Sequence, residues 1–164
     1  MNSNEWFNEL SKKDEESKKI IGFIVLWMAF DDKVTKWSEG RNDTIKGFNK
    51  LRQIKSFFTN NLKDSYNSKK DKFIQRFSQI SGGERKDDKR VALQTDMKTF
   101  YYRKNTADSG SDAYAEVLYA LRNNFFHGSK ESNESNKKLI CWAFDTLSEL
   151  LHAKYEDEFL YFNG

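Results

Sequence analysis

Residues 112–126 read DAYAEVLYALRNNFF, and this stretch decides the fold. Its apolar side chains recur at three- and four-residue spacing, the period of a helix with one face in a core. The residues expected to point inward are Tyr114, Val117, Leu118, Leu121 and Phe125. Gly128 follows shortly afterwards, and glycine readily adopts the left-handed conformation that ends a helix. We therefore predict a helix over residues 112–126 that ends near Gly128.

The rest of the chain has the same helical character. Its 164 residues include 8 glycines and no proline, so the usual punctuation of all-β folds is missing. We expect an all-α bundle of five or six helices in a single domain, residues 1–164. The helices are expected near residues 12–37, 43–62, 66–80, 91–102, 112–126 and 136–159, after a short turn near 6–10.

The first long helix contains one out-of-place carboxylate. Ser11 is its expected N-cap, and acidic residues follow in the first turns, where the helix dipole favours them. The expected core face consists of Ile20, Phe23, Ile24, Trp27, Asp31 and Val34. A carboxylate on such a face is costly unless it is paired. We therefore expect Asp31 to have a cationic partner.

Several classes of protein are disfavoured by composition. Cys141 is the only cysteine, which excludes an internal disulfide and suggests a core filler. The apolar run over residues 20–30 is about half of what a membrane span needs, and the N-terminus does not resemble a signal peptide. We expect a cytoplasmic protein without a membrane segment. Two histidines and one cysteine disfavour zinc, and residues 81–86 (SGGERK) lack a P-loop pattern, so no metal or cofactor is expected.

Charge is unevenly distributed along the chain. The net charge is only +3, but residues 41–76 hold ten basic and three acidic residues, a local balance of +7. Residues 145–158 hold five acidic residues and one lysine, a balance of −4. A basic side suits a polyanion such as RNA, whereas the plainer interpretation is that solvated helix faces carry lysine.

Arg122, Asn123 and His127 carry the candidate chemistry. Arginine can hold a phosphate through a fork of donors, and histidine can transfer a proton near neutral pH. Positions 122 and 127 differ by about 140° around a regular helix, so these two side chains do not share a face. Asn123 and His127 are four residues apart, so their side chains lie on the same face of a helix. Arg122 and His127 can therefore act on one phosphate only if the helix ends near His127, or if a second copy of the chain completes the site.

Residues 118–130 read LYALRNNFFHGSK, and their Arg-Asn-x3-His pattern resembles the R-x4-H motif of HEPN-domain proteins. Residues 26–31 (LWMAFD) also resemble the opening helix of some bacterial members, whereas residues 64–110 look like a family-specific insertion. The resemblance implies a helical domain that forms a homodimer with two motifs at a shared cleft. Many such domains are metal-independent endoribonucleases of toxin–antitoxin or anti-phage systems, so an antitoxin protein is a further expected partner. Others are inactive and bind nucleotide, RNA or a protein.

The residues fit a cleavage in which the 2′-hydroxyl of RNA attacks the adjacent phosphorus. His127 is the expected general base or acid, a role worth about 10²–10⁴-fold in rate. Arg122 would stabilise charge on the phosphoryl oxygens, and Asn123 would orient His127 or the phosphate. Lys130 and Asn124 are the expected substrate contacts, and Asp31 is the expected partner of Arg122. A helical interaction protein without cleft chemistry remains a third alternative.

Overall fold

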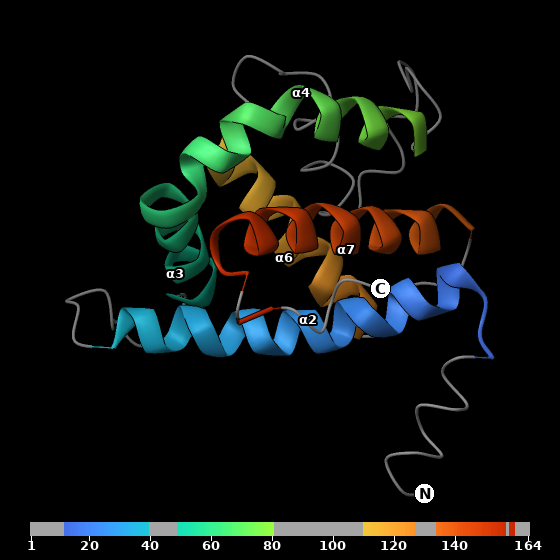
Figure 1. Ribbon diagram of the computed structural model, residues 1–164, viewed down its shortest axis with the longest axis horizontal. Coiled ribbons are helices and arrows are strands. Elements are labelled where there is room, and N and C mark those ends of the chain that lie inside the picture. The colour runs from blue at the N-terminus through green and yellow to red at the C-terminus, as the bar shows by residue number, and fades with distance from the viewer. Residues whose placement is uncertain (1–11, 40–48, 81–109, 127–133, 157, 160–164) are drawn as a thin grey trace, which may run out of the picture.

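The computed structural model describes residues 12–39, 49–80, 110–126, 134–156 and 158–159, and these form helices and short turns without a strand (Figure 1). The elements are α2 (Glu15–Ser38), α3 (Asn49–Phe57), the π-helical segment η1 (Phe58–Leu62), α4 (Lys63–Ile80), α6 (Ser111–Phe126) and α7 (Glu134–Lys154). The predicted all-α class is confirmed. The helices expected near 6–10 and 91–102 lie outside the described residues, so the count of five or six stays a prediction.

Helix α2 begins later than the sequence suggested. Its N-cap is Asp14, whose carboxylate accepts a hydrogen bond from the Ser17 backbone N–H at 2.8 Å, so the expected Ser11 cap is wrong. The core face is also turned relative to the prediction. The buried apolar side chains are Phe23, Leu26, Trp27, Phe30 and Val34. Ile20, Ile24 and Asp31 lie at the margins of this face, because the helix is apolar over most of its circumference and other helices decide which side is covered.

The predicted break between the second and third helices is wrong. Helix α3, η1 and α4 form one continuous helical segment that bends sharply, so that α3 and α4 run in different directions (Figure 1). The bend coincides with η1, and π-helical turns are a known cause of helix kinks. The side-chain amides of Asn60 and Asn61 donate to the carbonyls of Ser56 and Phe57 at 2.7 and 3.1 Å, which satisfies acceptors near the irregular turn.

Helix α7 lies between α2 and α4 (Figure 1). It runs parallel to α2, since Lys19 pairs with Asp145 and Lys33 with Glu158. It runs antiparallel to α4, since Lys69 pairs with Glu149 and Arg76 with Asp145. The predicted last helix was too long. It ends at Lys154, and the chain then turns so that Tyr155 stacks on Phe57 and Phe159 becomes buried.

Aromatic rings fill the core. The Tyr114 ring lies within 6.0 Å of the ring centroids of four other residues, Phe58, Tyr66, Phe73 and Trp142. Its hydroxyl donates to Thr146 Oγ1 at 2.7 Å, which satisfies a polar group in a dry interior. Helix α4 contributes Phe73, Ile74 and Phe77 to this core. The first part of the expected 64–110 insertion is therefore integral to the bundle, and residues 81–109 lie outside the described part of the chain.

None of the helices described here has a stretch that is both long and apolar enough to cross a membrane.

Candidate functional site

Helix α6 presents the candidate chemistry at its C-terminal end. Its observed span, Ser111–Phe126, agrees with the predicted 112–126. Four of the five expected core residues are buried, namely Tyr114, Val117, Leu118 and Leu121. Phe125 was wrongly placed inside, because it is 38% exposed. The apolar stripe thus continues past the edge of the core, and the last turn of α6 extends toward solvent.

Arg122 lies where the buried part of α6 gives way to the solvent-facing part. Its side chain is half-buried and its Nε atom is buried. Its Nη1 donates a hydrogen bond to Asn123 Oδ1 at 2.9 Å. The carboxamide therefore restricts the guanidinium of its own neighbour. The sequence suggested that Asn123 orients His127 or a phosphate, and a role in orienting Arg122 was missed although the two residues are adjacent.

The other half of the motif falls outside the described residues. His127, Gly128 and Lys130 belong to the stretch 127–133, so the predicted helix end and the expected phosphate contact stay predictions. Asn124 is half-buried in the last turn of α6, beside the exposed Phe125. The described part of the site therefore consists of a positioned arginine and two carboxamides at one end of a helix. These groups can donate hydrogen bonds to an anion.

Asp31 contacts a cation that the sequence pattern did not single out. Lys50 of α3 approaches Asp31 Oδ1 at 2.8 Å and donates a hydrogen bond to Thr35 Oγ1 at 2.7 Å. The Asp31 side chain is 39% exposed, so it lies at the rim of the core and not within it. This ion pair joins α2 to α3. The pairing of Asp31 with Arg122 stays a prediction.

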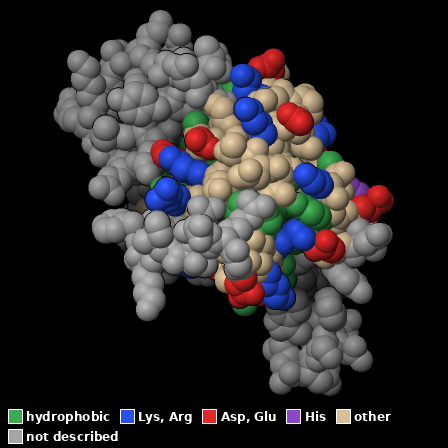
Figure 2. Space-filling view, turned by 90° about the vertical axis from the view of Figure 1, so that its left-hand side faces the viewer, with side chains coloured by type: hydrophobic (Ala, Val, Ile, Leu, Met, Phe, Trp, Pro, Cys, Tyr) green, Lys and Arg blue, Asp and Glu red, His purple; other side chains and the backbone are tan. Residues whose placement is uncertain are grey.

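Much of the uneven charge of the sequence is balanced between neighbouring helices. Lys69 and Lys72 of the basic stretch both contact Glu149 Oε1, at 3.0 and 3.3 Å, and Arg76 contacts Asp145 Oδ2 at 3.3 Å. Lys55 pairs with Glu116 of α6. On the face in Figure 2, basic and acidic side chains are interspersed. The basic stretch is therefore not a uniform positive surface. The sequence contains a signal for this pairing. Cations recur at three- and four-residue spacing at positions 69, 72 and 76, and carboxylates recur at the same helical spacing at positions 145 and 149.

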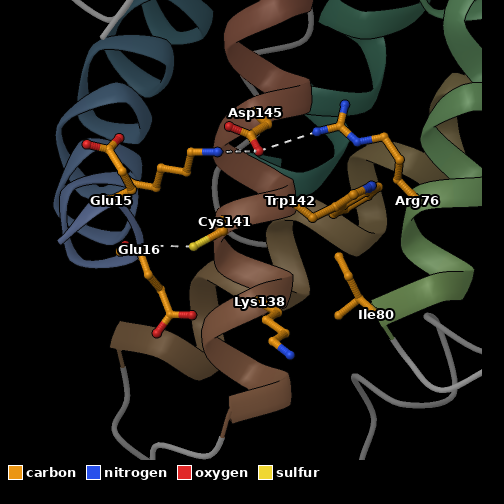
Figure 3. Close-up of a pocket in the computed structure, with 9 residues that line it drawn as sticks. Glu15, Glu16, Arg76, Ile80, Lys138, Cys141, Trp142 and Asp145 are labelled. Carbon is orange, nitrogen blue, oxygen red and sulfur yellow. Dashed lines mark hydrogen bonds and ion pairs between the residues drawn. The ribbon is translucent and has the colours of Figure 1, made fainter.

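A hollow of about 310 Å³ opens at the N-terminal half of α7, between α2 and α4 (Figure 3). Asp145 lies at one end, where Lys19 of α2 and Arg76 of α4 contact its Oδ2 atom at 3.0 and 3.3 Å. Lys138 lies at the other end, and the apolar side consists of Ile80, Cys141 and Trp142. The hollow therefore combines an apolar surface with charges of both signs.

Cys141 is a core-edge thiol, close to the filler that was predicted. Its Sγ contacts the Glu16 carbonyl oxygen at 3.7 Å, and burial raises the pKa of the thiol to about 11. A thiol with such a pKa is almost entirely protonated at neutral pH and is a poor nucleophile. Within the described ranges, no group of three or more histidine, cysteine, aspartate or glutamate residues is arranged to hold a metal ion.

Comparison with known proteins adds no relative. No family model, no curated protein and no solved structure matches this chain.

Proposed function

We propose that the chain is a HEPN-like, metal-independent endoribonuclease. The observation that carries the proposal is the contact between Arg122 Nη1 and Asn123 Oδ1, at the exposed end of α6. The contact supports a guanidinium held ready for a phosphate. His127 follows four residues after Asn123 and completes the Arg-Asn-x3-His pattern.

The proposed reaction is an intramolecular transfer within RNA. The 2′-oxygen loses its proton to a general base and attacks the adjacent phosphorus, while the bond from phosphorus to the 5′-oxygen breaks. The departing oxygen takes up a proton, which leaves a 2′,3′-cyclic phosphate and a 5′-hydroxyl. His127 supplies one of the two proton transfers, and Arg122 stabilises the charge that builds on the phosphoryl oxygens.

A homodimer is part of the proposal. Arg122 and His127 face different directions on a regular helix, so a shared cleft between two copies would let one phosphate meet both groups. Asn124 and Lys130 are the proposed additional substrate contacts. Asp31 would support the cleft through its ion pair with Lys50 or through Arg122. A toxin or anti-phage role with an antitoxin partner rests on the family resemblance, and a place in the cytoplasm rests on the single cysteine and the short apolar runs of the sequence.

The test is incubation of the purified protein with RNA in excess EDTA. We expect cleavage by the wild type and its loss in Arg122→Ala and in His127→Ala. Arg52→Ala is the matched control, since Arg52 is an exposed arginine on α3. Absence of cleavage by a well-folded wild type would refute the proposal. Retained binding of RNA or a fluorescent nucleotide would then indicate an inactive binding domain, and absence of both would indicate a helical interaction protein.

A further inference from the structure

A seam of charged side chains runs along the outer edge where α4 meets α7 and ends at α2. We call it the α4–α7 seam, and it consists of Lys19, Lys69, Lys72, Arg76, Asp145 and Glu149. Its arrangement is unusual in one respect. Glu149 is shared by two lysines, and Asp145 is shared by a lysine and an arginine. In other ion pairs, such as Lys36 with Asp32 and Lys33 with Glu158, one lysine faces one carboxylate.

Because two cations share each carboxylate, positive charge is in excess around Asp145 and around Glu149. Four cations meet two carboxylates, so each carboxylate neutralises only half of the charge that faces it. The cations remain accessible, since the exposed fractions of their side chains are 59% for Lys72, 37% for Lys19, 35% for Arg76 and 29% for Lys69. Asp145 is 25% exposed and Glu149 is 29% exposed, so Lys19, Lys72 and Arg76 are more exposed than either carboxylate, whereas Lys69 is exposed to the same degree as Glu149. An approaching anion therefore meets these three cations first.

The two shared carboxylates lie about one helical turn apart. Asp145 and Glu149 are four residues apart on α7, so they lie about 6 Å apart along the helix axis. Beyond Asp145, the seam opens into the hollow of about 310 Å³, where Lys138 provides a further exposed cation and Glu15 and Glu16 provide two carboxylates on the α2 side (Figure 3). Apart from Lys19, the row of cations therefore lies along α4 and α7 and does not extend across the hollow to α2. Evenly spaced single negative charges on a flexible chain would fit such a row better than one compact anion.

We propose that the α4–α7 seam binds the sugar–phosphate backbone of single-stranded nucleic acid, with Asp145 and Glu149 as internal competitors for its cations. Successive phosphates would each take one cation of a shared pair, while the carboxylate keeps the other. Backbone contacts of this kind position a strand without reading its sequence. The inference rests on the proposed function for RNA as the biological ligand, but binding at the seam requires neither Arg122 nor His127.

The test uses a fluorescein-labelled oligodeoxyuridylate of about 20 nucleotides, a length that spans more than one such contact. It has no 2′-hydroxyl, so the proposed cleavage cannot occur and a failure of that reaction does not affect the result. We expect binding to weaken with salt. For single strands the slope of log affinity against log salt is about −0.7 per neutralised phosphate. Lys69 and Lys72 share Glu149 and would together hold one phosphate, so Lys69→Gln with Lys72→Gln should reduce the magnitude of the slope by about 0.7 and weaken binding at every salt concentration.

Glu149→Gln gives the opposite expectation. It releases two lysines and should strengthen binding, a result that a purely structural role for the ion pairs does not produce. Lys36→Gln is the matched control, because Lys36 pairs with Asp32 alone and lies elsewhere on α2. Should the double variant fold poorly by circular dichroism, Lys72→Gln alone removes the most exposed cation of the seam.

Three results would overturn the proposal. The first is unchanged or weakened oligonucleotide binding in Glu149→Gln. The second is an equal loss of affinity in the lysine variants and in Lys36→Gln. The third is displacement of the labelled oligonucleotide by polyglutamate at the same charge concentration at which unlabelled oligonucleotide displaces it. The last would show an acidic polypeptide as an equally good ligand.

Discussion

Gly22 of α2 lies directly against the ring of Phe144 on α7, and Gly22→Ala tests how closely these helices approach. A Cβ atom at position 22 would lie 2.8 Å from Phe144 Cε2 and 3.0 Å from Phe144 Cζ. Either the ring or the helix must move to admit it. The same two helices hold Lys19 against Asp145, so their separation also positions the charged seam.

Two opposing effects determine how much Gly22→Ala changes the free energy of unfolding. Alanine is favoured over glycine within a helix by about 0.5–1 kcal/mol. Overpacking a filled interior costs about 1–3 kcal/mol. The close contact should win, so we expect Gly22→Ala to destabilise the protein by about 1 kcal/mol. In a Phe144→Leu background the ring is gone, and the same substitution should then be stabilising by about 0.5–1 kcal/mol.

Urea denaturation of the four proteins in this double-mutant cycle measures the free energy of unfolding of each. The prediction is a change of sign between the two backgrounds. Stabilisation of about 1 kcal/mol by Gly22→Ala in the wild type would refute the reasoning, because it would place position 22 at an open helix surface.

Three further predictions concern the site and the charged seam. Asn123→Ala removes the acceptor that restrains Arg122, so single-turnover RNA cleavage in EDTA should slow by about tenfold. Arg122→Ala should slow cleavage by about 10²–10³-fold, the usual effect of removing a hydrogen-bond donor to the transition state. Equal effects of the two substitutions would mean that Asn123 does more than position the arginine. Burial acts to raise the pKa of the Glu149 carboxyl, but hydrogen bonds from Lys69 and Lys72 outweigh it and hold the pKa below its ordinary value of 4.5. The stability that this carboxylate contributes is therefore lost as the pH falls through that lowered pKa, and the difference in unfolding free energy between wild type and Glu149→Gln should shrink in urea titrations below pH 4.5; a constant difference down to acid unfolding would contradict the ion pairs. Burial raises the pKa of the Cys141 thiol to about 11, so its reaction with a thiol reagent at pH 7.5 should be about 10–100-fold slower in the native protein than in urea; equal rates would show an open thiol.

The sequence predicted the helical class and the position of α6 because both depend on local pattern. Residues 112–126 have one apolar face and polar neighbours, so their period alone determines which side is buried. The α2 face was predicted less well. Residues 20–30 are apolar on most sides, and only the packing of α7 and α3 decides that Phe23, Phe30 and Val34 are covered while Asp31 lies at the rim.

The bend at η1 was not predictable from periodicity. A π-helical turn shifts the register of the apolar face, so residues 43–80 looked like two helices with a break, whereas the chain continues through Phe58–Leu62 without one. The distribution of charge along the sequence shows a basic and an acidic stretch, but the pairing of Lys69 and Lys72 with Glu149 depends on which helices become neighbours.

The candidate site could be predicted only as a set of residue types. The Arg-Asn-x3-His pattern identified Arg122 and Asn123, and the structure adds the hydrogen bond between them. A contact between adjacent helical residues depends on rotamers that the sequence does not specify. Phe125 was wrongly assigned to the core because periodicity does not show where along a helix the covering elements end.

Cleavage of a matched pair of oligonucleotides in EDTA tests whether the 2′-oxygen of RNA is the attacking atom. One is an oligoribonucleotide, and the other has the same sequence with deoxyribose throughout. We expect the wild-type protein to cut only the first and to leave a 2′,3′-cyclic phosphate, and we expect His127→Ala to cut neither. Cleavage of both oligonucleotides, or undiminished RNA cleavage by His127→Ala, would contradict attack by the 2′-hydroxyl assisted by Arg122 and His127.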